Sequence, residues 1–216
     1  MSRIEGLIKS ESFDYLQPIL YRNQNVLRCE LSEVHRGKAN RRTAFKNALA
    51  IYELLFPAGA DALFFHSNVS DMSLCEDYDF SRQEMEGILA CEREKLNLLA
   101  SLQNVKKRTV IENLARYDDA PAEVIKRNRI IFYAGSADLN EKALIKRLTD
   151  PREGRLQALE PSFVSFANEC ILSIYDERGC DIFFADKEKY RQFFHRLQPF
   201  LFDYDTELMR QYYTQN

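Results

Sequence analysis

The chain has 216 residues, of which 45% are hydrophobic and 29% are charged, and its formal net charge is −3. This balance fits one globular domain, excludes a low-complexity chain, and gives no reason to expect a nucleic acid as the main partner. The five cysteines are odd in number and form no CxxC motif, so we expect neither a disulfide framework nor a zinc site. No cofactor is predicted.

The N-terminal sequence MSRIEGLIKSESFDYL lacks the apolar stretch of a secretory signal. No apolar run approaches the roughly 20 residues that span a bilayer. We therefore expect a soluble protein of the reducing cytoplasm, with no membrane partner. Cys170 and Cys180 flank a predicted hairpin and can face each other, but in a reducing cell we expect them to be small core residues.

The first third of the chain predicts a strand, a helix and a strand. Residues 1–24 are interpreted as a helical lead-in, and the alternating residues 26–31 predict a strand. Apolar residues at helical spacing over 45–56 predict a helix that Pro57 ends. Residues 62–65 predict a short buried strand, so this third is consistent with one βαβ unit.

The middle of the chain is acidic and then helical. Residues 67–79 are rich in turn formers, and the clearest helix start of the chain follows at Ser81, which forms a capping box with Glu84. The apolar stripe of this helix continues to about Leu102. The role of the whole segment 67–127 is left open by its sequence.

The remaining elements alternate strands with short helices. Strands are predicted at residues 109–111, 130–133, 163–166, 171–175 and 180–184, and helices at 139–148, after Asp186 and after Asp205. The last three strands are typical of an antiparallel meander. The pattern predicts one α+β domain over residues 1–216, with a mixed, mainly antiparallel sheet and helices covering at least one face.

The turn between the last two strands has the sequence Asp176-Glu177-Arg178-Gly179. Asp176 is suited to bond the backbone two residues on, and Gly179 is expected to accept a positive φ. One interpretation is a hairpin turn held by Asp176 and by an ion pair between Arg178 and Asp181. The other is that Arg178, between two carboxylates, binds a phosphate or carboxylate ligand.

The C-terminal third resembles an uncharacterised bacterial family, a domain of unknown function. The family's Tyr-Asp-x-Arg-Gly-x-Asp turn matches here at Tyr175, Asp176, Arg178, Gly179 and Asp181. Its later Asp-Tyr-Asp segment matches Asp203-Tyr204-Asp205, and its early arginine-aromatic-glutamate-leucine strand matches residues 28–31, with cysteine in place of the aromatic residue. The resemblance covers roughly residues 160–213, and it implies a fold and a bacterial origin without an activity.

Two further positions are candidate sites. His66 stands at the carboxyl end of a predicted strand, where ligand sites of α/β proteins often lie, although a hydrogen-bonded structural histidine is the alternative. Asp203, Asp205 and Glu207 have the chemistry to ligate a hard cation, or they are simply the acidic start of a helix. No GxGxxG, GxxxxGK[ST], HExxH or GxSxG motif occurs.

Charge is unevenly spread along the chain. An acidic segment carries four carboxylates with no base among them, and these are Asp71, Glu76, Asp77 and Asp79. A basic cluster includes Arg36, Lys38, Arg41, Arg42 and Lys46. Either block can be ordinary solvated surface. Alternatively, the acidic segment complements a basic protein partner, and the basic cluster holds nucleic-acid phosphates.

These observations favour a non-enzymatic protein-binding module of the bacterial cytoplasm, and most specifically an immunity- or antitoxin-like inhibitor of a toxin encoded nearby. Asp71, Glu76, Asp77 and Asp79 are the expected partner-binding residues. The alternative is a small-ligand-binding protein or enzyme with a pocket near His66 and Arg178, since many sites assemble from residues far apart in sequence. Nucleic-acid binding through the basic cluster is the third hypothesis.

Overall fold

The computed structural model describes Gly6 and residues 23–35, 38–67, 106–113, 124–132, 141–150 and 162–214. The described strands are β1 (Val26–Glu30), β2 (Val34–His35), β3 (Lys38–Ala39), β4 (Ala62–Ser67), β5 (Lys106–Asn113), β6 (Val124–Phe132), β7 (Ser162–Ser165), β8 (Cys170–Ile174) and β9 (Gly179–Phe184). The described helices are α2 (Arg41–Leu55), α4 (Glu141–Leu148), α6 (Lys187–Arg196) and α7 (Thr206–Thr214), with 3₁₀ turns η5 (Gln198–Phe200) and η6 (Asp203–Asp205). The lead-in over residues 1–24 and the capping box at Ser81 lie outside the described residues, apart from Gly6, 23 and 24.

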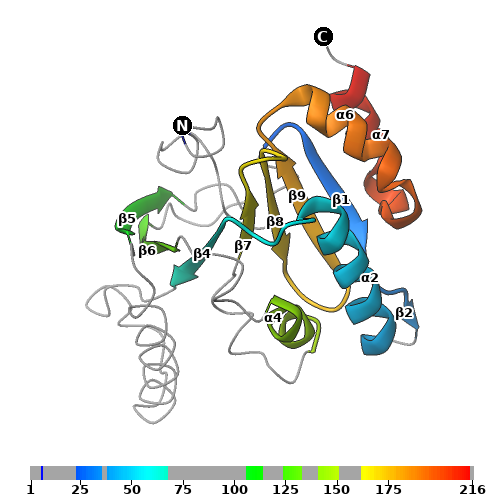
Figure 1. The fold of residues 1–216 in the computed structure, drawn as a ribbon, viewed down its shortest axis with the longest axis horizontal. Coiled ribbons are helices and arrows are strands. Elements are labelled where there is room, and N and C mark those ends of the chain that lie inside the picture. The colour runs from blue at the N-terminus through cyan, green and yellow to red at the C-terminus, as the bar shows by residue number, and fades with distance from the viewer. Residues whose placement is uncertain are drawn as a thin grey trace.

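Seven of these strands form one sheet in the order β1-β9-β8-β7-β4-β6-β5 (Figure 1). Each described pairing of neighbouring strands in this sheet is antiparallel. The predicted α+β class and the β7-β8-β9 meander are therefore confirmed, whereas the sheet was expected to be mixed and its described pairings are all antiparallel. The predicted strand–helix–strand unit is also present, but β1 and β4 are separated by three strands, so they run in the same direction without pairing.

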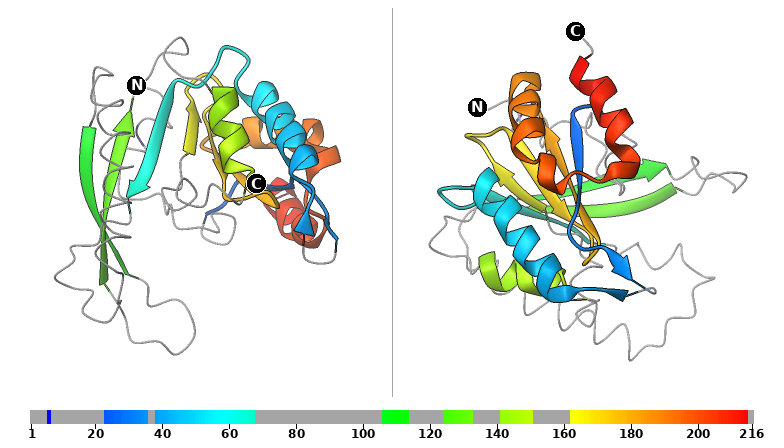
Figure 2. Two further views of the ribbon diagram at one scale, coloured as in Figure 1. Left: turned by 90° about the horizontal axis from the view of Figure 1, so that it is seen from below. Right: turned by 90° about the vertical axis from the view of Figure 1, so that its right-hand side faces the viewer.

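One face of the sheet is covered by helices (Figures 1 and 2). The register places Phe163 of β7 and Phe184 of β9 on the same face. The ring of Phe163 meets Tyr52 of α2 edge-on with the ring centroids 5.1 Å apart, and Phe184 stacks on Phe193 of α6 at 5.3 Å. These aromatic contacts fix α2 and α6 over the meander, and they make the fully buried Phe163 and Phe184 the centre of the core.

Local signals account for the helix ends. Asn40 accepts hydrogen bonds from the backbone N–H groups of Arg42 and Thr43 at the start of α2, and Asp186 accepts one from Lys189 at the start of α6, as predicted. After α2 the chain turns at Gly59, whose φ of 87° is in the left-handed region that glycine adopts freely. The turn leads into β4.

β1 is an edge strand, and the C-terminal segment covers its outer side. The backbone N–H of Phe202 donates to the carbonyl of Arg28 at 3.0 Å, and Leu201 forms a β-bridge with Cys29. The backbone N–H of Arg28 meets the sulfur of Met209 at 3.1 Å. An unpaired strand edge is a template for aggregation, so this segment both protects β1 and gains a fixed position on it.

Candidate functional site

A buried ion-pair network joins β1, β9 and the C-terminal segment. The guanidinium of Arg28 donates from Nε and Nη2 to the two carboxylate oxygens of Asp181, at 2.8 and 3.0 Å, and from Nη1 to Asp205 at 3.1 Å. Asp181 is fully buried, Asp205 is 4% exposed and Arg28 is 7% exposed. Two carboxylates therefore surround one buried cation through a bidentate and a single contact.

The electrostatics of the network follow from this geometry. Burial works to lower the pKa of Arg28, but the hydrogen bonds and charge of Asp181, with smaller contributions from Tyr175 and Asp205, raise it on balance. The ring of Tyr175 lies 6.0 Å from the Arg28 guanidinium carbon. Burial, followed by the charge of Asp181, raises the pKa of the Tyr175 hydroxyl. The Tyr175 hydroxyl therefore stays neutral, and the Tyr175 ring forms one side of the network.

The hairpin turn differs from the prediction in two respects. Asp176 accepts the backbone N–H of Arg178 at 2.7 Å, as predicted, but Arg178 pairs with Asp176 and not with Asp181, because Asp181 points to Arg28. The expected positive φ at Gly179 is also wrong, since Gly59 is the glycine with positive φ in the described part of the chain.

Gly179 is needed for space. A Cβ there would lie 2.7 Å from Cζ of Tyr175 and 2.9 Å from the carbonyl oxygen of Cys29, both closer than real Cβ contacts. The Tyr175 ring consequently packs directly on the backbone of β9. Gly179 therefore leaves room for the Tyr175 ring, and the backbone conformation of the turn does not require a glycine at this position.

The network anchors a short exposed turn. Asp205 is tied to Arg28, and the backbone of Phe202 is tied to β1, so the two residues between them project outward. Tyr204 is 83% exposed, and among the described residues it is the one large hydrophobic side chain that is exposed. Its ring centroid lies 6.2 Å from that of Phe202. We call residues 202–205 the Tyr204 turn.

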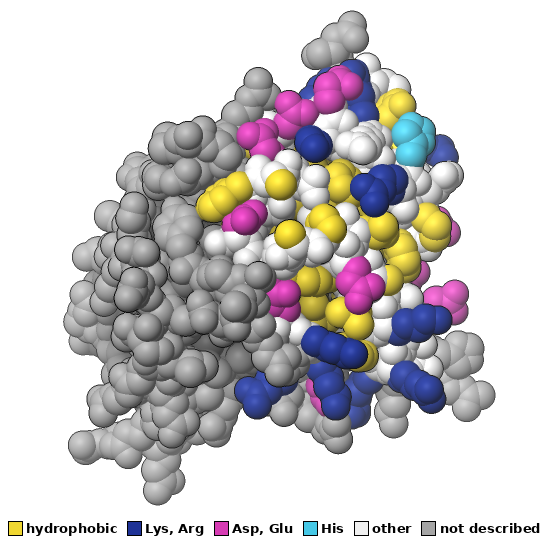
Figure 3. Space-filling view, in the orientation of Figure 1, with side chains coloured by type: hydrophobic (Ala, Val, Ile, Leu, Met, Phe, Trp, Pro, Cys, Tyr) yellow, Lys and Arg dark blue, Asp and Glu magenta, His cyan; other side chains and the backbone are white. Residues whose placement is uncertain are grey.

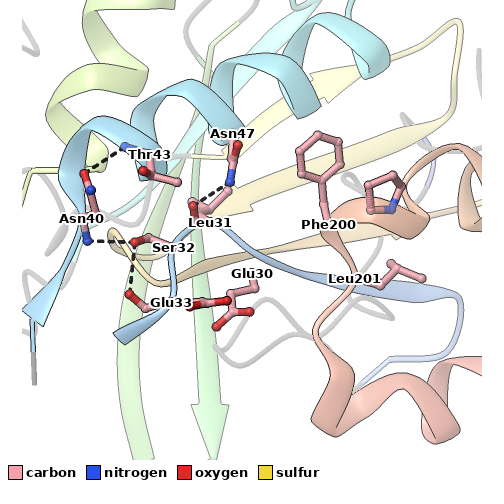
Figure 4. Close-up of a pocket in the computed structure, with 10 residues that line it drawn as sticks. Glu30, Leu31, Ser32, Glu33, Asn40, Thr43, Asn47, Phe200 and Leu201 are labelled. Carbon is pink, nitrogen blue, oxygen red and sulfur yellow. Dashed lines mark hydrogen bonds between the residues drawn. The ribbon is translucent and has the colours of Figure 1, made fainter. Parts of the chain in front are cut away.

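A pocket of about 450 Å³ lies beside this turn, between the end of β1, the start of α2 and η5 (Figure 4). Ten residues line it: Glu30, Leu31, Ser32, Glu33, Asn40, Thr43, Asn47, Pro199, Phe200 and Leu201. Partial burial, followed by the negative charges of Glu33 and Asp203, raises the pKa of Glu30. We call this cavity the β1–α2 pocket, and Leu201, which lines it, directly precedes the Tyr204 turn.

The other predicted site residues are not brought together with this pocket. The backbone of His66 is in β4, as predicted, and its register puts it at the same end of the sheet as Arg178, with β7 and β8 between. Neither residue lines the β1–α2 pocket. Asp71, Glu76, Asp77 and Asp79 lie outside the described residues.

The described residues offer little to a metal ion. Among the residues that the structure describes, no group of three or more metal-ligating side chains comes together. The predicted alternative at Asp203 and Asp205 is not assembled, because Asp205 is buried against Arg28 while Asp203 is exposed. No described helix has the length and apolar character to cross a bilayer.

The three buried cysteines of the described residues are core side chains. Cys180 stands opposite Cys29 on β1 and not opposite Cys170, so the two cysteines do not face each other, and both are buried core residues as expected. Burial raises the pKa of the Cys170 thiol, and a hydrogen bond to Cys29 followed by burial raises that of Cys180. Thiols held in this neutral form are poor nucleophiles.

Sequence reasoning missed the β1–α2 pocket. Its signal was the polar run of residues 30–33 after a strand, followed by the helix cap at Asn40. For the Arg28 network the signal was better: Arg28, Asp181 and Asp205 are all positions that carry the family resemblance. The structure shows that three distant motifs meet at one ion-pair network.

The fold and these sites define an α+β protein with a seven-stranded antiparallel sheet and a pocket at the end of its edge strand. The chain matches the family described as "Domain of unknown function (DUF3885)" over residues 9–205, and it therefore belongs to that family. The match is wider than the C-terminal resemblance and includes all three residues of the Arg28 network. No curated protein and no solved structure is significantly similar to the chain.

Proposed function

We propose that the protein is a non-enzymatic protein-binding module, and most specifically an immunity- or antitoxin-like inhibitor of a toxin in the bacterial cytoplasm. The observation that carries this proposal is Tyr204, which is 83% exposed on a turn that is fixed at both ends to the edge strand. Tyrosines are enriched among the residues that dominate interface energies, and a rigid turn lowers the entropy lost on binding.

The charges near Tyr204 favour a basic partner. Asp203 and Glu207 flank it in the sequence and are exposed, and Glu33 lies at the neighbouring pocket. Carboxylates around an aromatic anchor steer a cationic surface toward it and disfavour acidic competitors. We extend the proposal to Asp71, Glu76, Asp77 and Asp79 as a second acidic contact with the same partner.

The test begins with the product of the adjacent gene, co-expressed and co-purified with the full chain. Tyr204→Ala is expected to weaken this complex at least about tenfold, because loss of an interface aromatic anchor typically costs 2 kcal/mol or more. Gln192→Ala, at an exposed position of α6, is the matched control and is expected to bind like the parent. Absence of a complex, or equal affinities of parent and Tyr204→Ala, would contradict the proposal.

The acidic segment has its own kinetic test. Neutralising Asp71, Glu76, Asp77 and Asp79 together to Asn or Gln is expected to slow association with that partner. The slowing should shrink at high salt, because screening weakens steering. Association like that of the parent at low salt would leave these four residues as ordinary solvated surface.

One observation favours nucleic-acid binding as a second candidate. Basic side chains gather on the face shown in Figure 3, over α2 and α4. On these two helices Arg42, Lys46, Lys146 and Arg147 are exposed. Part of this charge is already neutralised, since Arg41 pairs with Asp150 at 3.5 Å. Submicromolar, selective binding in a gel shift at about 0.15 M salt would replace the protein partner with a nucleic acid.

The ligand-binding alternative near His66 and Arg178 has less structural support. Arg178 already forms an exposed ion pair with Asp176, so an anion would compete with that carboxylate. A metabolite retained during purification and located beside these two residues would favour this alternative over the protein partner.

A further inference from the structure

The β1–α2 pocket has three chemically different walls (Figure 4). Pro199, Phe200 and Leu201 form an apolar wall, while Asn40, Thr43 and Asn47 of the α2 start form a polar one. The carboxylates of Glu30 and Glu33 complete the lining. A cavity of about 450 Å³ falls within the range of small-ligand sites, and mixed walls of this kind fix the orientation of an occupant.

The two carboxylates are not neutralised by the described protein. Within the described part of the chain, neither Glu30 nor Glu33 has an ion pair or hydrogen bond through its carboxylate. Glu30 is instead surrounded by the like charges of Glu33 and Asp203. A bound cation would relieve this repulsion, whereas an anion would add to it.

The hydrogen-bonding groups of the polar wall point to the same class of ligand. The Asn47 amide donates its Nδ2 to the carbonyl of Leu31 at 3.0 Å, so its oxygen faces away from that bond (Figure 4). Asn40 caps α2 with its oxygen, and the Ser32 hydroxyl accepts from Asn40 and donates to the carbonyl of Glu33. Among the described residues, the acceptors that remain free in the pocket include the carboxylates of Glu30 and Glu33 and the Asn47 oxygen, and a ligand with several N–H donors is their complement.

We propose that the β1–α2 pocket binds an organic cation, a guanidinium or primary ammonium group on a short apolar stem. The carboxylates and the Asn47 oxygen receive the N–H groups, and the apolar wall with the face of Phe200 receives the stem. A guanidinium fits best, since it presents five donors in a fixed plane.

The source of this cation rests on the proposed function. Leu201 lines the pocket and directly precedes Phe202, the first residue of the Tyr204 turn, so the two sites are adjacent and one basic protein can occupy both. The cation is then an arginine or lysine side chain of that partner.

The experiment titrates the full chain with N-acetyl-arginine amide and follows the Asn47 side-chain amide by NMR. Saturable binding of this probe is expected, with N-acetyl-norleucine amide, the uncharged counterpart, binding at least about tenfold more weakly. Glu30→Gln/Glu33→Gln is expected to lower the affinity at least about fivefold. Glu53→Gln, which changes an exposed carboxylate of α2 outside the pocket, should bind like the parent.

Three results would overturn the proposal: no saturable binding, equal binding of the norleucine probe, or equal binding by the double variant. Thermal melts check that the double variant is folded, and Asn47→Leu, followed through the Asn40 side-chain amide, should also bind the probe more weakly than the parent. Free arginine binding more than about tenfold tighter than the capped probe would also overturn it, because the source would then be a metabolite.

Failure of this proposal can be told apart from failure of the proposed function. Tyr204→Ala should retain binding of N-acetyl-arginine amide while losing the protein partner. If the double variant binds the partner as the parent does, the cation pocket is wrong and the protein-binding function stands. If the probe binds and no partner exists, the protein-binding function is wrong and the cation chemistry of the pocket stands.

Discussion

Arg28 and Glu30 stand two residues apart on β1 and have opposite electrostatic surroundings. Arg28 is buried between two carboxylates, whereas Glu30 lies at a pocket with two other carboxylates nearby. The first arrangement neutralises a charge inside the protein, and the second leaves a charge available to something outside it. One end of this strand therefore serves the fold, and the other end is the better place to look for function.

The largest expected effect is at the Arg28 network. Asp181→Ala should destabilise the protein by about 3–5 kcal/mol, because it leaves the buried Arg28 with one carboxylate in place of two. Arg178→Ala is the control: the Arg178 side chain is 64% exposed, and ion pairs of the kind it forms with Asp176 contribute about 0–1 kcal/mol. Urea unfolding of the two variants measures the difference. Equal losses would show that the buried network is not special.

The next largest effect concerns the glycine that faces this network. Gly179→Ala should cost about 1–3 kcal/mol, because the new Cβ would overlap the Tyr175 ring and crowd the Cys29 carbonyl. The clash, and not backbone conformation, is the expected cause. In a Tyr175→Ala background the same substitution should therefore cost less, a coupling that a double-mutant cycle measures. Strict additivity of the two changes would argue against the steric explanation.

The comparison also shows what the sequence can reveal. Strand and helix positions were predictable from local periodicity, as for α2 and the β7-β8-β9 meander, and the caps at Asn40 and Asp186 follow ordinary side-chain chemistry. The partners of Arg28 were not predictable by local reasoning, since they lie 153 and 177 residues away along the chain. Local reasoning paired Asp181 with the nearest arginine, Arg178, although burial selects the distant one.

The same limit applies to the β1–α2 pocket. Its walls come from β1, α2 and η5, which meet because the C-terminal segment covers the edge of β1. No window of the sequence contains more than a part of it. The role of Gly179 is similar, because a hairpin position is readable from sequence whereas the proximity of the Tyr175 ring is a fact of packing.

The smallest expected effect, and the one that tests the pocket side of the comparison, is at Glu30. Its pKa is raised by partial burial and by Glu33 and Asp203, so the folded protein holds a proton on this carboxyl more tightly than the unfolded chain does. Stability from this group is therefore present below the unfolded pKa and is lost as the pH rises through the folded pKa. Glu30→Gln, which cannot ionise, should melt slightly above the parent at pH 7.

This advantage should disappear in acid, where the Glu30 carboxyl of the parent is protonated in both the folded and the unfolded chain. Thermal melts of the two proteins at pH 7 and near pH 4 provide the measurement. Glu30 lines the pocket and is repelled by the charges of Glu33 and Asp203. A bound cation would relieve this repulsion, and this is the electrostatic reason for the pocket to bind one. A Glu30→Gln variant less stable than the parent at pH 7 would mean that Glu30 has a structural partner, and the β1–α2 pocket would lose its electrostatic reason to bind one.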